Sequence, residues 1–143
     1  LHKDEALEAE CNVEHHDLDT VLKRSDVISL HVPLARSTHH LIGHRELGLV
    51  KPTAILINTA RGPIIDQTAL VHALQSKRLA AAGLDVFEDE HHVPAPLRHL
   101  PNVTLTPHSA SATLEAREAM AKLAAENVLA VLAGKPPLNP VKG

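Results

Sequence analysis

The chain has 143 residues, enough for one domain with a hydrophobic core, and 44% hydrophobic with 22% charged residues is ordinary for a globular protein. A formal net charge of -3 gives no reason to expect nucleic acid or a membrane surface as a partner, and no apolar run approaches the roughly 20 residues of a membrane-spanning helix. The single cysteine, Cys11, excludes an internal disulfide and fits a reducing compartment, so we expect a cytoplasmic protein.

Apolar runs alternate with helical patterns along the chain. Four runs have the length and β-branched content of buried strands: residues 26–33, 54–57, 79–87 and 103–106. Helices are predicted where apolar residues recur at helical spacing or follow a cap residue: residues 3–10, 17–22, 45–50, 67–74 and 114–133. Strands that alternate with helices predict an α/β fold with a parallel sheet and flanking helices.

Smaller features complete this pattern. The central run, 54–57, is typical of a strand buried on both faces. We interpret Asp26 and Asp66 as caps, as we do Asp17 at the start of its helix. A short edge strand is expected at 11–14, and the prolines after residue 90 predict an irregular loop up to Leu100.

Twelve histidines, among them the adjacent pairs at 15–16, 39–40 and 91–92, raise the hypothesis of a metal site. Neighbouring side chains point apart on a strand and do not face each other on a helix. No CxxC spacing accompanies these pairs. Surface histidines are the better interpretation, and we expect no metal site.

Arg61, Glu90 and His108 each lie at or just beyond the end of a predicted strand. Because the carboxyl ends of parallel strands meet at one edge of a sheet, where open α/β sheets bind ligands, the three side chains are expected to converge. Each also has a simpler interpretation. On this interpretation Arg61 would be a solvated loop cation and His108 a solvated histidine. Glu90 would belong to an acidic surface together with Glu88 and Asp89.

A guanidinium, a carboxylate and an imidazole together suit the reduction of a 2-keto acid. Arg61 would hold the substrate carboxylate through a pair of charge-assisted hydrogen bonds. His108 would give a proton to the carbonyl oxygen as hydride arrives at carbon, and Glu90 would orient the imidazole. Convergence of polar residues at a strand edge is by itself a weak signal.

Five stretches carry a resemblance to a known family: LHVPL at 30–34, VKPTAILINTARGPIID at 50–66, AAGLDVFEDE at 81–90, LPNVTLTPHSASAT at 100–113 and NVLAVLAGKPPLNPV at 127–141. Together they resemble the D-isomer-specific 2-hydroxyacid dehydrogenases and cover nearly the whole chain. Within that family the sequence is most similar to the glyoxylate/hydroxypyruvate reductases, also called 2-ketogluconate reductases.

The resemblance implies catalytic roles for Arg61, Glu90 and His108, and it places Asp85 near the nicotinamide amide. It also implies cofactor contacts from residues that follow the strands: His31, Val32, Pro33, Thr59, Ala60, Arg61, Asp85, His108, Ser109, Ala110 and Ser111. The cofactor would be NAD or NADP, with NADPH favoured by the subgroup. The substrate would be a small 2-keto or 2-hydroxy acid, and full-length relatives would be homodimers.

Two departures from the family pattern concern the expected site. Glu90 is followed by His91 where the family usually has proline, which would loosen the loop that holds Glu90. After His108 the family often has Gly-Gly or Gly-Ser, whereas residues 109–111 here are Ser-Ala-Ser, a variant with small side chains.

No GxGxxG occurs in the sequence, so the turn that brings a pyrophosphate to a helix N-terminus is absent from it. The resemblance implies that this turn, the first βαβ unit and the substrate domain precede Leu1. We therefore expect residues 1–108 to form a partial dinucleotide-binding domain with an incomplete Rossmann-like parallel sheet. Residues 109–143 would form a C-terminal helix and tail that return to the missing substrate domain.

Two functional hypotheses follow. The first is an NAD(P)-dependent oxidoreductase fragment that reduces a 2-keto acid such as glyoxylate or hydroxypyruvate and is inactive by itself. The second is a non-catalytic remnant or a nucleotide-sensing interaction protein, similar to a corepressor, on the same scaffold. The presence of Arg61, Glu90 and His108 favours an enzymatic ancestry.

Overall fold

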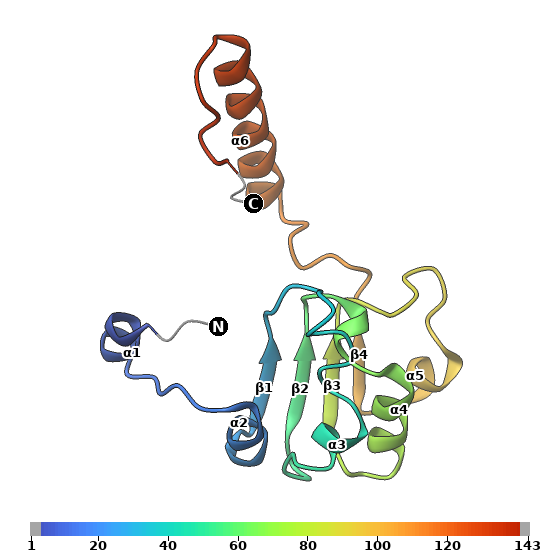
Figure 1. The fold of residues 1–143 in the computed structure, drawn as a ribbon. Coiled ribbons are helices and arrows are strands. Elements are labelled where there is room, and N and C mark those ends of the chain that lie inside the picture. Colours follow the sequence, from blue (N-terminus) through green and yellow to red (C-terminus); the bar gives the residue numbers. More distant parts are fainter. Residues whose placement is uncertain (1–3, 141–143) are drawn as a thin grey trace. The chain divides into compact units, whose positions relative to one another are not determined.

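The computed structural model describes residues 4–140 and contains a four-stranded parallel sheet with strand order β1-β2-β3-β4 (Figure 1). The helices and strands are α1 (Glu5–Cys11), α2 (Leu18–Arg24), β1 (Val27–Leu30), α3 (His44–Leu47), β2 (Ile55–Asn58), the short 3-10 helix η1 (Gly62–Ile64), α4 (Gln67–Gln75), β3 (Ala81–Leu84), α5 (Ala95–His99), β4 (Val103–Leu105) and α6 (Leu114–Leu132). The predicted α/β fold with a parallel sheet and flanking helices is confirmed.

The chain divides into two compact units, the first ending at Pro107 and the second beginning at His108. The first unit contains the whole sheet and helices α1 to α5. The second unit contains α6, which Thr113 caps by accepting a hydrogen bond from the Ala116 amide. The predicted end of this helix is confirmed, since Gly134 adopts a positive φ of 71°.

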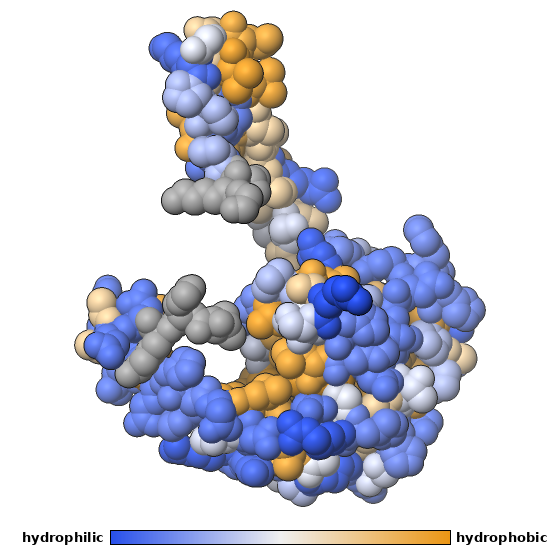
Figure 2. All heavy atoms as spheres, viewed as in Figure 1, coloured by the Kyte–Doolittle hydropathy of each residue, from blue (hydrophilic) through white to orange (hydrophobic). Residues whose placement is uncertain are grey.

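The tail after α6 returns along the helix within the second unit. The side chain of Asn127 accepts a hydrogen bond from the Asn139 amide at 3.1 Å and donates to the Asn139 side chain at 3.3 Å. Helix α6 buries none of its residues, and Figure 2 shows apolar residues on its surface. That this segment returns to a substrate domain stays a prediction.

The core of the first unit lies on one face of the sheet. Alternate strand residues, such as Ile28 and Leu56, are buried in one hydrophobic cluster with Leu70 and Leu74 of α4. The core residues are Leu22, Ile28, Leu30, Ile42, Leu47, Val50, Ala54, Leu56, Ile64, Ile65, Ala69, Leu70, Ala73, Leu74, Leu79, Ala82, Leu84, Phe87 and Leu97.

The other face of the sheet is open, so the expectation that the central strand is buried on both faces is wrong. Val27 in β1 is 60% exposed and Ile55 in β2 is 38% exposed. The burial pattern alternates along both strands because successive side chains point to opposite faces and only one face is packed.

Three smaller expectations are also wrong. No strand forms at 11–14, because α1 extends to Cys11 and Asn12 ends it in the left-handed conformation, with φ 51°. Asp26 is not a cap: its carboxylate accepts a hydrogen bond from the Lys51 ammonium at 2.9 Å. The loop before Leu100 contains helix α5, whose prolines lie at the start, where a helix does not need their missing N–H groups.

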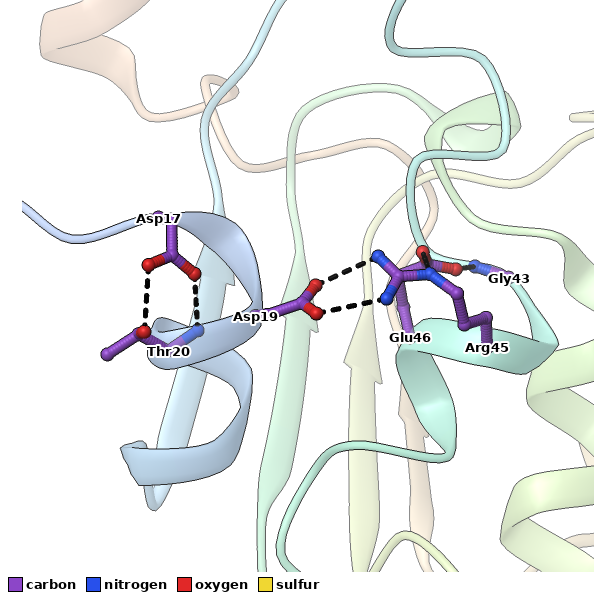
Figure 3. Close-up of polar contacts among 6 residues, drawn as sticks. All are labelled: Asp17, Asp19, Thr20, Gly43, Arg45 and Glu46. Carbon is purple, nitrogen blue, oxygen red and sulfur yellow. Dashed lines mark hydrogen bonds and ion pairs between the residues drawn. The ribbon is translucent and has the colours of Figure 1, made fainter.

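An ion-pair network connects helix α2 to helix α3 (Figure 3). Both carboxylate oxygens of Asp19 accept hydrogen bonds from the Arg45 guanidinium, at 2.8 and 3.0 Å. Arg45 also donates to Glu46, whose other carboxylate oxygen accepts from the Gly43 amide. The hydrogen bonds from Arg45 hold the pKa of Asp19 below its ordinary value.

This network makes a prediction about pH. Because the pKa of Asp19 is lower in the folded chain than its ordinary value of 3.8, its carboxylate stabilises the fold above pH 3.8, and this contribution is lost as the pH falls below it. We expect Asp19→Asn to lower the melting temperature at neutral pH, and the difference from the wild type to shrink as the pH falls from about 5 to about 3. Circular dichroism melts across this range measure the difference.

The control is the same substitution made in an Arg45→Ala variant, which lacks the cationic partner of Asp19. In that background Asp19→Asn should change the melting temperature much less, because the carboxylate no longer has its partner. A difference between Asp19→Asn and wild type that stays constant across the pH range would show that the ion pair does not contribute.

Candidate functional site

The register of the sheet places the ends of the first three strands side by side. Leu30 pairs with Asn58 and Asn58 pairs with Leu84, so the last residues of β1, β2 and β3 form one row. The residues that follow these strands, among them His31, Thr59 and Asp85, therefore emerge at the same edge. This is the edge at which the sequence places its candidate site, and it is where open α/β sheets bind ligands.

The turn that carries Arg61 is shaped by the side chain of Asn58, which is 1% exposed. Its amide oxygen accepts a hydrogen bond from the Ala60 amide at 3.0 Å, and its amide nitrogen donates to the Arg61 carbonyl at 3.0 Å. A buried asparagine whose side chain bonds to the backbone just after it specifies a tight turn. Sequence reasoning missed Asn58, although an asparagine at the end of an apolar strand was the available signal.

Arg61 lies on the wall of a cavity of about 570 Å³. Two segments that are distant in the sequence form this wall: residues 31–34 after β1 and residues 60–61 after β2. The lining thus contains His31, Val32, Pro33, Ala60 and Arg61, all of which the family resemblance places at the cofactor. The cavity is polar on the side of the exposed Arg61 and His31, and apolar at Val32 and Pro33.

The loop that carries Glu90 is packed directly against the Arg61 turn. Gly62 approaches the backbone of Phe87 so closely that a Cβ at this position would overlap the Phe87 carbonyl group. The Glu90 carboxylate accepts a hydrogen bond from the Phe87 amide at 3.3 Å, which ties the loop back to the end of β3. Arg61 and Glu90 are therefore on neighbouring segments at one edge of the sheet.

Asp85 is buried beside the end of β4. The residue is only 4% exposed, and its carboxylate accepts a hydrogen bond from the Thr106 hydroxyl. The backbone fixes both residues, since the Asp85 amide donates to the Asn58 carbonyl and the Thr106 amide donates to the Leu84 carbonyl. A buried carboxylate at this edge has a defined orientation, which a ligand contact needs.

His108 has a positive φ of 52° and opens the second unit, together with Ser109, Ala110 and Ser111. Within that unit the Ala112 amide donates to the Ser109 carbonyl at 2.9 Å. Within the first unit, the structure brings residues 31–34, residues 60–61, Asp85 and Glu90 to the same edge of the sheet. The convergence of His108 with Arg61 and Glu90 stays a prediction.

Two further properties concern residues 4–140 alone. No group of three or more His, Cys, Asp or Glu side chains among them is arranged to hold a metal ion. None of the helices described in this range combines the length and the apolar composition that crossing a membrane requires.

The comparison with protein families matches residues 1–110 to the D-isomer specific 2-hydroxyacid dehydrogenase, NAD binding domain. The chain belongs to this family. The resemblance seen in its sequence motifs is thereby confirmed.

Several curated relatives that share about half of the matched residues with this chain are named as reductases. The glyoxylate reductase of Thermococcus litoralis is 53% identical over 105 residues, which cover 73% of this chain and 32% of that protein. The glyoxylate/hydroxypyruvate reductase B of Enterobacter agglomerans is 49% identical over 112 residues, or 78% of this chain and 34% of that protein. The chain thus spans about a third of the length of these relatives.

Solved structures of family members share the fold. D-lactate dehydrogenase with NAD+ from Lactobacillus jensenii has a TM-score of 0.91 and 36% identity, covering 100% of this chain and 47% of that one. The NADPH-dependent glyoxylate/hydroxypyruvate reductase from Sinorhizobium meliloti, in complex with NADP and malonate, has a TM-score of 0.85 and 40% identity, covering 90% and 40%.

The close approach at Gly62 makes a prediction about stability. Gly62→Ala should lower the free energy of unfolding by about 2 kcal/mol or more, because the new methyl group cannot fit without moving the Phe87 backbone. Gly43→Ala is the control, since a Cβ there has its nearest contact at 3.5 Å, and it should cost about 1 kcal/mol or less. Urea unfolding of the two variants measures the difference, and equal losses would contradict the prediction.

Proposed function

We propose that this chain is the nucleotide-binding part of an NAD(P)-dependent D-2-hydroxyacid dehydrogenase that reduces a small 2-keto acid such as glyoxylate or hydroxypyruvate. The observation that supports it most is the cavity at the sheet edge, where Arg61 faces the segment 31–34. The names of the relatives support the substrate class, since those from Thermococcus litoralis and Enterobacter agglomerans are called glyoxylate and glyoxylate/hydroxypyruvate reductases.

The residues present fit part of a nicotinamide cofactor. The cavity wall combines apolar surface at Val32 and Pro33 with polar groups, and the buried Asp85 carboxylate, which accepts a hydrogen bond from the Thr106 hydroxyl, lies near the same edge. Residues 31–33, 59–61, 85 and 108–111 would hold the cofactor, which supplies the hydride when it is bound. We propose NAD or NADP, with NADPH favoured by the subgroup; solved relatives contain NAD+ in one case and NADP in another.

The chemistry assigned to the chain's own residues is simple. Arg61 binds the carboxylate of the keto acid and so orients its carbonyl group. As hydride adds to the carbonyl carbon, the electron pair of the C=O bond moves to oxygen, and His108 gives this oxygen a proton to form the hydroxy acid. Glu90 orients the imidazole of His108 for this transfer.

The test requires the rest of a dehydrogenase. A hybrid protein would join the part of the Thermococcus litoralis reductase that precedes the matched segment to the whole of this chain. We expect the hybrid to oxidise NADPH or NADH in the presence of glyoxylate. Folding and cofactor binding without any reduction of glyoxylate or hydroxypyruvate would contradict the proposal and favour the non-catalytic interaction protein.

Two substitutions in the hybrid separate the proposed roles. Arg61→Ala should raise the KM for glyoxylate about 100-fold, because it removes a charge-assisted pair worth about 3 kcal/mol. His108→Ala should lower kcat by about 100-fold or more with little change in KM. Steady-state kinetics with Arg98→Ala and His15→Ala, exposed residues of the same types, serve as controls. Unchanged kinetics in either site variant would refute that role.

A further inference from the structure

We propose that Glu88 is a positioning residue that holds the Arg61 turn and the Glu90 loop in one fixed arrangement. The catalytic consequence of this proposal rests on the proposed function, whereas its structural part does not. Glu88 follows Phe87, the residue against which Gly62 packs, and it precedes Glu90 by two residues. From the sequence alone, Glu88 was interpreted only as part of an acidic surface next to Glu90.

One oxygen of the Glu88 carboxylate joins three separate segments. It lies 2.8 Å from Nε2 of His40, in the loop before α3, and it accepts a hydrogen bond from the Gln67 amide, at the start of α4, at 3.1 Å. Glu88 itself lies in the loop after β3. A single side chain therefore connects residues that are 48 and 21 positions away in the sequence.

The contact with His40 reaches the Arg61 turn through the backbone. His40 adopts a positive φ of 50°, and its amide donates to the Pro63 carbonyl at 2.8 Å. Two further hydrogen bonds continue this pairing, from the Ile42 amide to the Ile64 carbonyl at 3.1 Å and from the Asp66 amide to the Ile42 carbonyl at 3.0 Å. The segment just after Arg61 is thus attached to the loop that Glu88 holds.

The contact with Gln67 fixes the other end of the same segment. The first amides of a helix have no partner within the helix, and its N-terminus favours negative charge. In α4 the Asp66 side chain accepts from the Ala69 amide, and Glu88 accepts from Gln67. Residues 62–66 therefore lie between two attachments to Glu88, while Gly62 packs on the backbone that leads to it.

The contacts of Glu88 are expected to affect turnover more than global stability. The side chains of His40 and Glu88 are 40% and 32% exposed, so the contact between them is open to solvent and adds little to global stability. A small displacement of catalytic groups, in contrast, changes a rate strongly, with about 100-fold lost for a shift of about 1 Å. Loss of Glu88 should consequently reduce turnover more than it reduces stability.

The first test measures kinetics of the hybrid protein with substitutions at Glu88. Glu88→Ala should lower kcat for glyoxylate reduction about tenfold, because the Arg61 turn and the Glu90 loop lose their common attachment. Glu88→Gln should recover most of the rate, since its amide oxygen accepts the same hydrogen bonds. Asp89→Ala is the matched control: its carboxylate accepts from the His91 amide within its own loop, and we expect no change.

A second variant tests the route through His40. His40→Asn removes the imidazole while keeping a residue that tolerates the left-handed backbone, so it should lower kcat without unfolding the loop. Combined with Glu88→Ala it should add little further loss, because both substitutions break the same contact. Equal losses of kcat in Glu88→Ala and Asp89→Ala, or fully additive losses in the double variant, would overturn the proposal.

The structural part is measured on the 143-residue chain by NMR hydrogen exchange. The Gln67 and His40 amides should exchange faster in Glu88→Ala than in the wild type or in Asp89→Ala. Unchanged exchange at both amides would overturn the proposal, whatever the hybrid does. A hybrid that is inactive with its wild-type residues, combined with faster exchange in Glu88→Ala, would refute the proposed function while leaving Glu88 as the residue that joins the two segments.

Discussion

The parallel hydrogen-bond register of the sheet is the constraint on which the other features depend. It pairs Leu30 with Asn58 and Asn58 with Leu84, so that three strands end in one row. Residues that leave the strands there therefore emerge at one edge of the sheet. A slip of one residue would turn every apolar side chain of a strand to the opposite face, and the packed core therefore fixes the register that places the candidate site.

Contacts between neighbouring loops at this edge then fix the positions of the candidate site residues. Asn58 folds the turn before Arg61, and the absence of a side chain at Gly62 allows that turn to rest on the Phe87 backbone. Glu88 reaches from the next loop to attach the segment after the turn. These residues would touch neither substrate nor cofactor in the proposed reaction, and they set the positions of those that would.

The packing of the sheet on one face is consistent with a chain that spans about a third of the length of its named relatives. Val27 and Ile55 present apolar surface on the open face, and α6 buries none of its residues. Exposed apolar surface of this kind in a larger protein is covered by further structure.

The sequence by itself determined the α/β fold, the family, the caps Asp17 and Asp66 and the motif that contains Arg61, because periodicity, capping and motifs depend on neighbouring residues. Tertiary structure alone decided which face of each strand is buried and the ion pair of Asp26 with Lys51. It also decided the link from Glu88 to His40, 48 residues away. Such contacts depend on distance in space, which no local pattern records.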